Sequence, residues 1–256
     1  MRDPAPNSYI ICTSPRSGST LLCHLLRATG VAGRPGSLFH VPRLDGWLND
    51  YGLSETKFAT HQDALRAVFA KAREKGAGGT ALFGLRMQRP SFPFFMAQLA
   101  QLHPGLPNDR ARIEAAFGPT LFVYLNRADK LDQAISRVKA EQTGLWHRAA
   151  DGSELERNGP PAEPSYDAAA IAHHLDALTQ MDAEWAAWFA AQKVSPMRIE
   201  YRALSANPRA ELARILAALN LAPEIANQTA IPTAKLADDI NTQWRERFRA
   251  GHAPAP

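Results

Sequence analysis

The stretch SYIICTSPRSGSTLLCHLLRATG at residues 8–30 limits what this chain can fold into more than any other feature. Its apolar run at 9–12 predicts a buried parallel strand, and leucines then recur at helical spacing until Gly30. Between the two elements, Gly18 lets the backbone approach a ligand, and the free amides at the start of the helix attract an anion. Arg16 adds a fork-shaped cation. The order predicts a strand, an anion-binding loop and a helix.

The loop at residues 13–20 resembles the Walker A loop in spacing but departs from it at two positions. Under the pattern G-x-x-x-x-G-K-[ST], Thr13 stands at the first glycine and Ser19 at the lysine. Because the lysine for β- and γ-phosphates is missing, the loop is expected to hold a shorter anion at a 5′ position through Arg16, backbone amides and hydroxyl groups. The alternative is a serine-rich turn that only caps the helix.

The rest of the chain alternates between strands and helices. Further strands are predicted at residues 80–87, 120–125 and 196–201. Further helices are predicted at residues 63–75, 92–103, 128–140, 167–193, 208–220 and 238–249. This order predicts an α/β fold with a P-loop-NTPase-like parallel sheet flanked by helices. We expect a single domain over residues 1–256, with a lid or insertion at about 143–166, where the sequence is polar and contains glycine and proline.

Polar residues that follow the strands are candidates for ligand contact, because ligands of open α/β sheets bind beyond the carboxyl ends of the strands. Arg86, near the end of the second strand, and Arg127, just after the third, are expected on that side. The loop after Gly30 supplies candidates to face an acceptor, namely Arg34, Ser37, His40, Arg43 and Asp45. Each of these is equally well explained as a solvated loop residue.

Charge and cysteine content narrow the class of protein. The 29 Lys and Arg residues against 25 Asp and Glu residues give a net charge of +4, which is too small and scattered for nucleic-acid binding but suits small anionic ligands. No apolar run precedes Tyr9 and no later one is long enough to span a bilayer, so we expect no secretory signal, no transmembrane segment and a cytoplasmic location. Cys12 and Cys23 lie in apolar surroundings and are expected to be reduced, and no metal-ligand spacing predicts a metal site.

Two motifs give the chain a family resemblance. The segment PRSGST at residues 15–20 resembles the P-[KR]-S-G-[ST]-T loop of sulfotransferases that use 3′-phosphoadenosine 5′-phosphosulfate (PAPS). From residue 9 to about 248, the chain is similar to the bacterial trehalose 2-sulfotransferase family, chiefly through SPRSGSTLL and NRADKLDQAIS. The segments LRATGVAG, AEWAAWF and KLADDINTQWRERF support the same alignment.

The resemblance implies PAPS as co-substrate, adenosine 3′,5′-bisphosphate (PAP) as product and a set of residues that bind them. By this resemblance the 5′-phosphosulfate is held by Arg16, Ser17, Gly18, Ser19 and Thr20. The 3′-phosphate is held by Arg127 and Ser136, and Lys235 is a further nucleotide contact.

One departure from the family concerns the acceptor. Arg34 and Ser37 stand where the trehalose enzymes carry acidic residues, one of which is thought to act as the base. Neither a trehalose-like acceptor site nor a glutamate base therefore carries over. His40, three residues after Ser37, is the nearest side chain suited to accept a proton, with Asp45 as second choice. The alternative is that His40 binds the acceptor or is an ordinary loop residue.

These expectations describe a PAPS-dependent sulfotransferase that acts on a hydroxyl of a carbohydrate or glycolipid. Arg16 would stabilise the charge that grows on the departing phosphate, and His40 would take the acceptor proton. Because the donor is already activated, no metal ion is expected. Two alternatives stay open, a non-catalytic nucleotide-binding module and a P-loop-type small-molecule kinase, and the sequence is also compatible with a homodimer.

Overall fold

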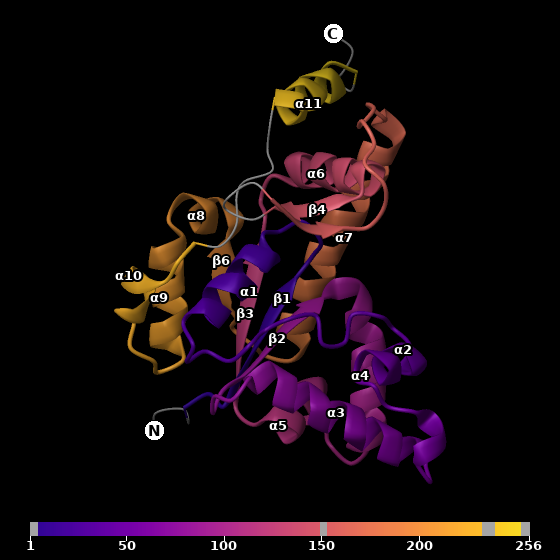
Figure 1. The fold of residues 1–256 in the computed structure, drawn as a ribbon, viewed down its shortest axis with the longest axis vertical. Helices are drawn as coiled ribbons and strands as arrows, with labels where there is room; N and C mark the ends of the chain where they lie inside the picture. The colour runs from indigo at the N-terminus through magenta and orange to yellow at the C-terminus, as the bar shows by residue number, and fades with distance from the viewer. Residues whose placement is uncertain (1–4, 149–152, 232–238, 252–256) are drawn as a thin grey trace.

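A four-stranded parallel sheet lies at the centre of the computed structural model, which describes residues 5–148, 153–231 and 239–251 (Figure 1). Its strands, in the spatial order β2–β1–β3–β6, are β2 (Phe83–Gln88), β1 (Ser8–Thr13), β3 (Thr120–Asn126) and β6 (Met197–Glu200). Ile11 of the inner strand β1 lies opposite Arg86 on one side and Val123 on the other. The carboxyl ends of all four strands therefore meet at one edge, and the predicted α/β sheet is confirmed.

Helices cover both faces of the sheet. Their bounds are α1 (Ser19–Ala28), α2 (Leu44–Asp50), α3 (His61–Ala77), α4 (Phe92–Leu102), α5 (Asp109–Phe117), α6 (Lys130–Thr143), α7 (Ala168–Ala191), α8 (Tyr201–Ala206), α9 (Pro208–Ala218), α10 (Ile225–Gln228) and α11 (Asp239–Gly251). Two 3-10 turns, Glu55–Lys57 and Arg89–Ser91, interrupt the connections. Of the helices described, none combines the length and the apolar character that crossing a membrane requires.

The alternation of side chains along β1 builds two separate cores. Ile10 and Cys12 pack with aromatic residues of α3, α4, α5 and α7, whereas Tyr9 and Ile11 pack with leucines of α1 and α9. All four β1 side chains are at most 1 % exposed. A strand buried on both faces is held rigidly, and the loop that leaves its carboxyl end starts from a fixed point.

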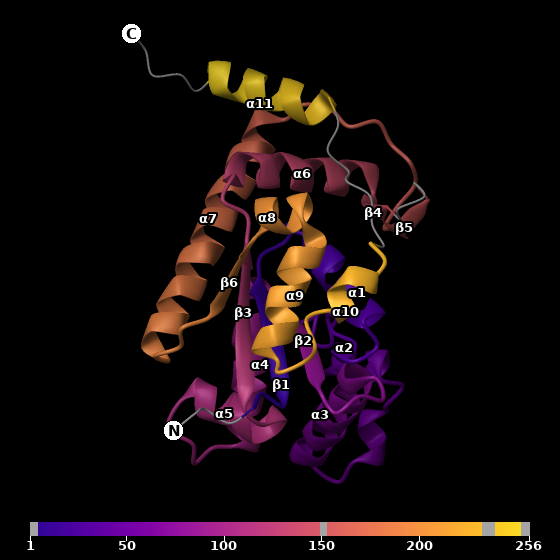
Figure 2. The same cartoon turned by 90° about the vertical axis from the view of Figure 1, so that its left-hand side faces the viewer.

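A third layer lies across the carboxyl edge of the sheet. In Figure 2, α6 crosses above the strands and α11 lies over α6. Apolar residues of α6, α7 and α11, including Ile135, Leu178 and Trp244, form their own buried cluster there. This layer forms one wall of the space into which the strand-end loops project.

Two segments differ from the sequence predictions. The second strand begins at Phe83 instead of residue 80, because the Thr80 hydroxyl donates to the carbonyl of Ala77 (3.0 Å) and accepts from the amide of Leu82 (3.2 Å), which makes a turn. Within the expected lid or insertion, strands β4 (Leu145–Arg148) and β5 (Glu154–Arg157) form an antiparallel pair. The predicted lid role of this β4–β5 hairpin stays a prediction.

Candidate active site

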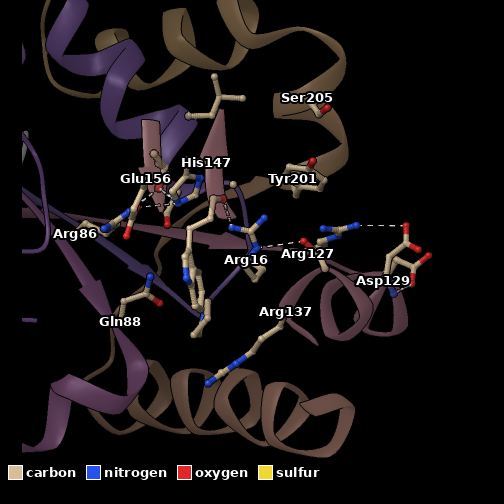
Figure 3. A pocket seen from close by; sticks show the side chains of 18 of the residues that line it. Arg16, Arg86, Gln88, Arg127, Asp129, Arg137, His147, Glu156, Tyr201 and Ser205 are labelled. Atoms are coloured by element: carbon tan, nitrogen blue, oxygen red, sulfur yellow. Dashed lines mark hydrogen bonds and ion pairs between the residues drawn. The ribbon is translucent and has the colours of Figure 1, made fainter. Parts of the chain in front are cut away.

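A cavity of about 1090 Å³ opens at the carboxyl edge of the sheet. Its lining comes from the loop after β1, the end of β2, the loop after β3, one side of α6, the hairpin β4–β5, α8 and one side of α11. Figure 3 shows the side chains of Arg86, Arg16 and Arg127 directed into this space from three different elements. The site therefore lies where the strand-end argument places it.

The loop after β1 is held in a shape that ordinary residues adopt at a cost. Arg16 has a φ of 63° and Gly18 a φ of 87°. A Cβ atom on Gly18 would lie 2.5 Å from the ring of Tyr201, so glycine is needed both for the backbone conformation and for the close approach of α8. The helix α1 then begins at Ser19, with its first amides at the cavity.

Buried hydrogen bonds to β3 and α6 hold the loop after β1 in place. The hydroxyl of Thr13 contacts that of Ser17 and donates to the carbonyl of Leu125 (2.9 Å). The amide of Gln133 donates to the Ser14 hydroxyl (3.0 Å) and to the carbonyl of Pro15 (2.6 Å). Because the Ser17 side chain is buried in this network, the predicted ligand contact of Ser17 can come only from its backbone amide.

Arg16 is the cation at the centre of the site. Its Nε donates to the hydroxyl of Ser136 (3.1 Å), and its Nη1 donates to the carbonyl of Trp146 (2.5 Å). Burial, and then the nearby charge of Arg127, lower the pKa of Arg16 to about 10. Arg16 stays charged at neutral pH, and two neighbouring cations favour an anion between them.

Arg127 is only 8 % exposed and is clamped between an aromatic ring and a carboxylate. Its guanidinium lies 4.6 Å from the centre of the Tyr201 ring, and its Nη2 lies 3.3 Å from Oδ2 of Asp132. Arg245 of α11 is ion-paired with the same Asp132 and, at 3.7 Å, with Asp129. Two further cations thus lie beside Arg16, namely Arg127 from the loop after β3 and Arg245 from α11, and both are held by carboxylates at the start of α6.

Thr20 connects the loop to the other half of the cavity. Its hydroxyl accepts from Nη1 of Arg86 (2.8 Å) and lies 2.9 Å from Nε2 of His147 in the hairpin. Glu156 lies on the facing strand, 3.5 Å from the same nitrogen. Burial, and then the charges of Arg16 and Arg86, lower the pKa of His147 to about 3, so this imidazole is neutral at physiological pH.

Of the candidate acceptor-facing residues that follow α1, His40 lines the cavity, whereas Arg34, Ser37 and Asp45 lie outside its lining. His40 lines the cavity with an exposed side chain, and its carbonyl accepts from Ser91 (2.5 Å). Ser37 accepts from Arg86, whereas Arg34 lies over Gly78. Asp45 is outside the lining and pairs with Arg43 at the surface, which makes it a poor second choice for the base.

The structure thus brings Arg16, Gly18, Ser19, Thr20, Arg127, Ser136 and His40 to one cavity. Lys235 lies outside the described residues. Sequence reasoning missed His147, Tyr201 and Arg245. Tyr201 directly follows β6 and could have been found by the same strand-end rule that singled out Arg127. In the part of the chain that the structure describes, no cluster of three His, Cys, Asp or Glu side chains could hold a metal ion.

Comparison with known proteins gives a family match over nearly the whole chain. The profile of the Stf0 sulphotransferase family matches residues 8–251. A trehalose 2-sulfotransferase of Mycolicibacterium smegmatis is 27 % identical over 261 residues, covering 95 % of each chain. A trehalose 2-sulfotransferase of Mycobacterium tuberculosis is 29 % identical over 266 residues, covering 96 % of each chain.

Two solved structures match with lower similarity. The sulfotransferase domain of the Synechococcus PCC 7002 olefin synthase has a TM-score of 0.43 and 17 % identity, over 100 % of this chain and 92 % of that one. A sulfotransferase from Alicyclobacillus acidocaldarius has a TM-score of 0.43 and 14 % identity, over 98 % of this chain and 92 % of that one.

Proposed function

The chain belongs to the Stf0 sulphotransferase family, and from this premise we propose that it transfers a sulfuryl group from PAPS to a hydroxyl of a carbohydrate or glycolipid. The observation that carries the proposal is the contact between Arg16 of the anion-binding loop and Ser136 of α6, at 3.1 Å. Arg127 lies near enough for its charge to lower the pKa of Arg16, so the loop proposed for the 5′ anion lies beside the cation proposed for a second phosphate. A nucleotide with phosphate groups at both its 5′ and its 3′ position matches two such adjoining positive regions.

The residues present fit this donor. Backbone amides at the start of α1, the Thr20 hydroxyl and the Arg16 guanidinium would hold the 5′-phosphosulfate. Arg127 and Ser136 would hold the 3′-phosphate, for which Arg127 would exchange its contact with Asp132, a carboxylate that Arg245 also holds. The donor could therefore bind without leaving the half-buried carboxylate of Asp132 unpaired.

The transfer has simple requirements. The acceptor oxygen bonds to sulfur, the bond between sulfur and the phosphate oxygen breaks, and the acceptor proton passes to a base. Arg16 and the first residues of α1 line the cavity, so Arg16 and the loop amides would stabilise the phosphate that gains charge. We assign the base to His40, which lies at the cavity rim where solvent can remove the proton.

The acceptor is expected to differ from trehalose. The two curated relatives are named for sulfation of trehalose. In this chain the corresponding residues are Arg34 and Ser37, and neither has a carboxylate to orient a sugar hydroxyl. Ser37 instead binds Arg86, and Arg34 lies over Gly78. Carbohydrates and glycolipids other than trehalose are the acceptor classes to screen.

The donor is tested most directly by thermal shift. PAP without Mg²⁺ should raise the melting temperature, because a ligand that binds only the folded state stabilises it. A response to ATP with Mg²⁺ and none to PAP would instead indicate a kinase. Binding of PAP without any transfer of labelled sulfate to sugar or lipid extracts would indicate a non-catalytic module.

The base is tested by His40→Ala, with His61→Ala at an exposed position on α3 as the matched control. Loss of a general base costs roughly 100-fold or more in turnover, while PAP binding should stay normal. The control should keep both. If His40→Ala keeps its turnover, the assignment of the base is wrong, although the proposed transfer itself is not.

A further inference from the structure

Arg86 is the arginine that bridges the two halves of the cavity. Leu85 and Met87 of β2 point into the core beside α3 and α4, so Arg86 between them points to the opposite face, toward α1. There its Nη1 donates to the hydroxyl of Thr20, in the anion-binding loop at residues 13–20 that we propose binds the sulfuryl donor and call the donor loop. Its Nε and Nη2 donate to the hydroxyl of Ser37, at 2.9 and 2.6 Å, in the loop assigned to the acceptor.

The charge of Arg86 has no counterpart within the described protein. Two other arginines that line the cavity are ion-paired, Arg127 with Asp132 and Arg137 with Glu141. Arg16, like Arg86, has only neutral hydrogen-bond partners among the described residues. Among the residues that the structure describes, no carboxylate forms an ion pair with Arg86, and its hydrogen-bond partners are the neutral hydroxyl groups of Thr20 and Ser37. Glu156 is connected to Thr20 only through His147. A half-buried guanidinium in this state favours an anion as its missing partner.

The guanidinium also has donors to spare. Of its five N–H groups, three make the contacts named above, which leaves one on each terminal nitrogen. The side chain lines the cavity, so these two N–H groups are available to a ligand. Two N–H groups on one rigid fork suit two oxygens of a tetrahedral anion.

We propose that Arg86 binds the sulfuryl group during its transfer, an inference that rests on the proposed function. The group that moves from donor to acceptor passes between the Thr20 and Ser37 loops, and Arg86 is fixed to both. Arg86 would stabilise the charge on the sulfuryl oxygens, while Arg16 stabilises the departing phosphate. This division of labour gives Arg86 a contact with the sulfuryl oxygens and none with the rest of the nucleotide.

The test compares two ligands that differ only by the sulfuryl group. Dissociation constants of PAPS and PAP are measured for the wild type, Arg86→Gln and Arg86→Lys by calorimetry without acceptor. Arg86→Gln should weaken PAPS at least 10-fold, change PAP less than 3-fold and lower kcat at least 100-fold. Arg86→Lys keeps the charge but loses the forked pair of N–H groups, so its PAPS affinity and its kcat should lie between those of the wild type and Arg86→Gln.

Arg66→Gln removes an arginine on the surface of α3 that pairs with Asp63, and it should match the wild type in every measurement. Equal weakening of PAPS and PAP by Arg86→Gln would mean that Arg86 only shapes the pocket, and would overturn the proposal. A change confined to the acceptor KM would mean contact with the acceptor, and would also overturn it. If the wild type binds PAP and both Arg86 variants prefer PAPS over PAP by the same factor as the wild type, this inference fails and the proposed function stands.

Discussion

Replacing Gly18 by alanine tests whether the shape of the donor loop depends on the contact between α1 and α8. Two costs add at this position. A left-handed backbone costs an alanine about 1–2 kcal/mol, and the φ of Gly18 is 87°. The new Cβ would also lie 2.5 and 2.9 Å from two ring carbons of Tyr201, and relieving such crowding costs about 1–3 kcal/mol.

Gly79 provides a matched control within the same chain. Its φ is 88°, and an added Cβ would have nothing within 4 Å, so Gly79→Ala carries the backbone cost alone. Both variants are compared by thermal unfolding, where each kcal/mol lowers the melting temperature by roughly 2–4 °C for a protein of this size. Gly18→Ala should unfold at a lower temperature than Gly79→Ala by an amount that corresponds to the crowding.

Ligand binding gives the second readout. Displacement of Tyr201 would disturb Arg127, which stacks on its ring, so Gly18→Ala should weaken PAP at least ~10-fold while Gly79→Ala leaves its affinity unchanged. Tyr201→Ala removes the crowding, so in a Tyr201→Ala background Gly18→Ala and Gly79→Ala should lower the stability by similar amounts. Equal stability losses in the two single variants, together with unchanged PAP binding by Gly18→Ala, would refute this reasoning.

Three further outcomes are expected. Arg16→Ala should abolish sulfate transfer while circular dichroism shows an unchanged fold, because Arg16 lies in a loop outside the core; near-normal turnover would refute its role. Arg127→Ala or Ser136→Ala should reduce the preference for PAP over adenosine 5′-phosphate, each by about 1–3 kcal/mol of binding free energy in direct titrations; an unchanged preference in both would show that the 3′-phosphate binds elsewhere. The pKa of His147 is near 6.5 in the unfolded chain and about 3 in the folded chain, so the free energy of unfolding should fall on acidification between these pH values, by up to ~1.4 kcal/mol per pH unit. His147→Gln should flatten this slope in urea titrations. An equal slope in the variant would contradict the shifted pKa.

Local sequence patterns predicted the strands and the β1–loop–α1 unit, because both depend on neighbours in the chain. The apolar run of β1, Gly18 and the leucines of α1 lie within one short stretch, and the strand-end position of Arg127 follows from parallel topology. The hairpin β4–β5 escaped because its strands are short and polar and alternate too briefly to give a period.

Contacts across long sequence separations could not be predicted in the same way. The hydroxyl of Ser136 reaches Arg16 across 120 positions, and His147 reaches Thr20 across 127. Sequence motifs identified three of these four residues separately, but only the packing of α6 and the hairpin onto the loop brings each pair together. The lack of an ion-pair partner for Arg86 among the described residues likewise depends on tertiary packing, which keeps carboxylates out of contact with its guanidinium.

The position of α11 over α6 has a consequence for the order in which the site is completed during synthesis. The ribosome releases the donor loop and Arg127 long before Arg245, which lies on α11 and follows every strand of the sheet. Until α11 has docked, Asp132 has Arg127 as its only ion-pair partner among the described residues, and the arginine that we propose binds the nucleotide is held by a carboxylate. A nascent chain that has folded its sheet would therefore bind nucleotide weakly, and docking of α11 would give Asp132 a second partner, so that a nucleotide could compete for Arg127.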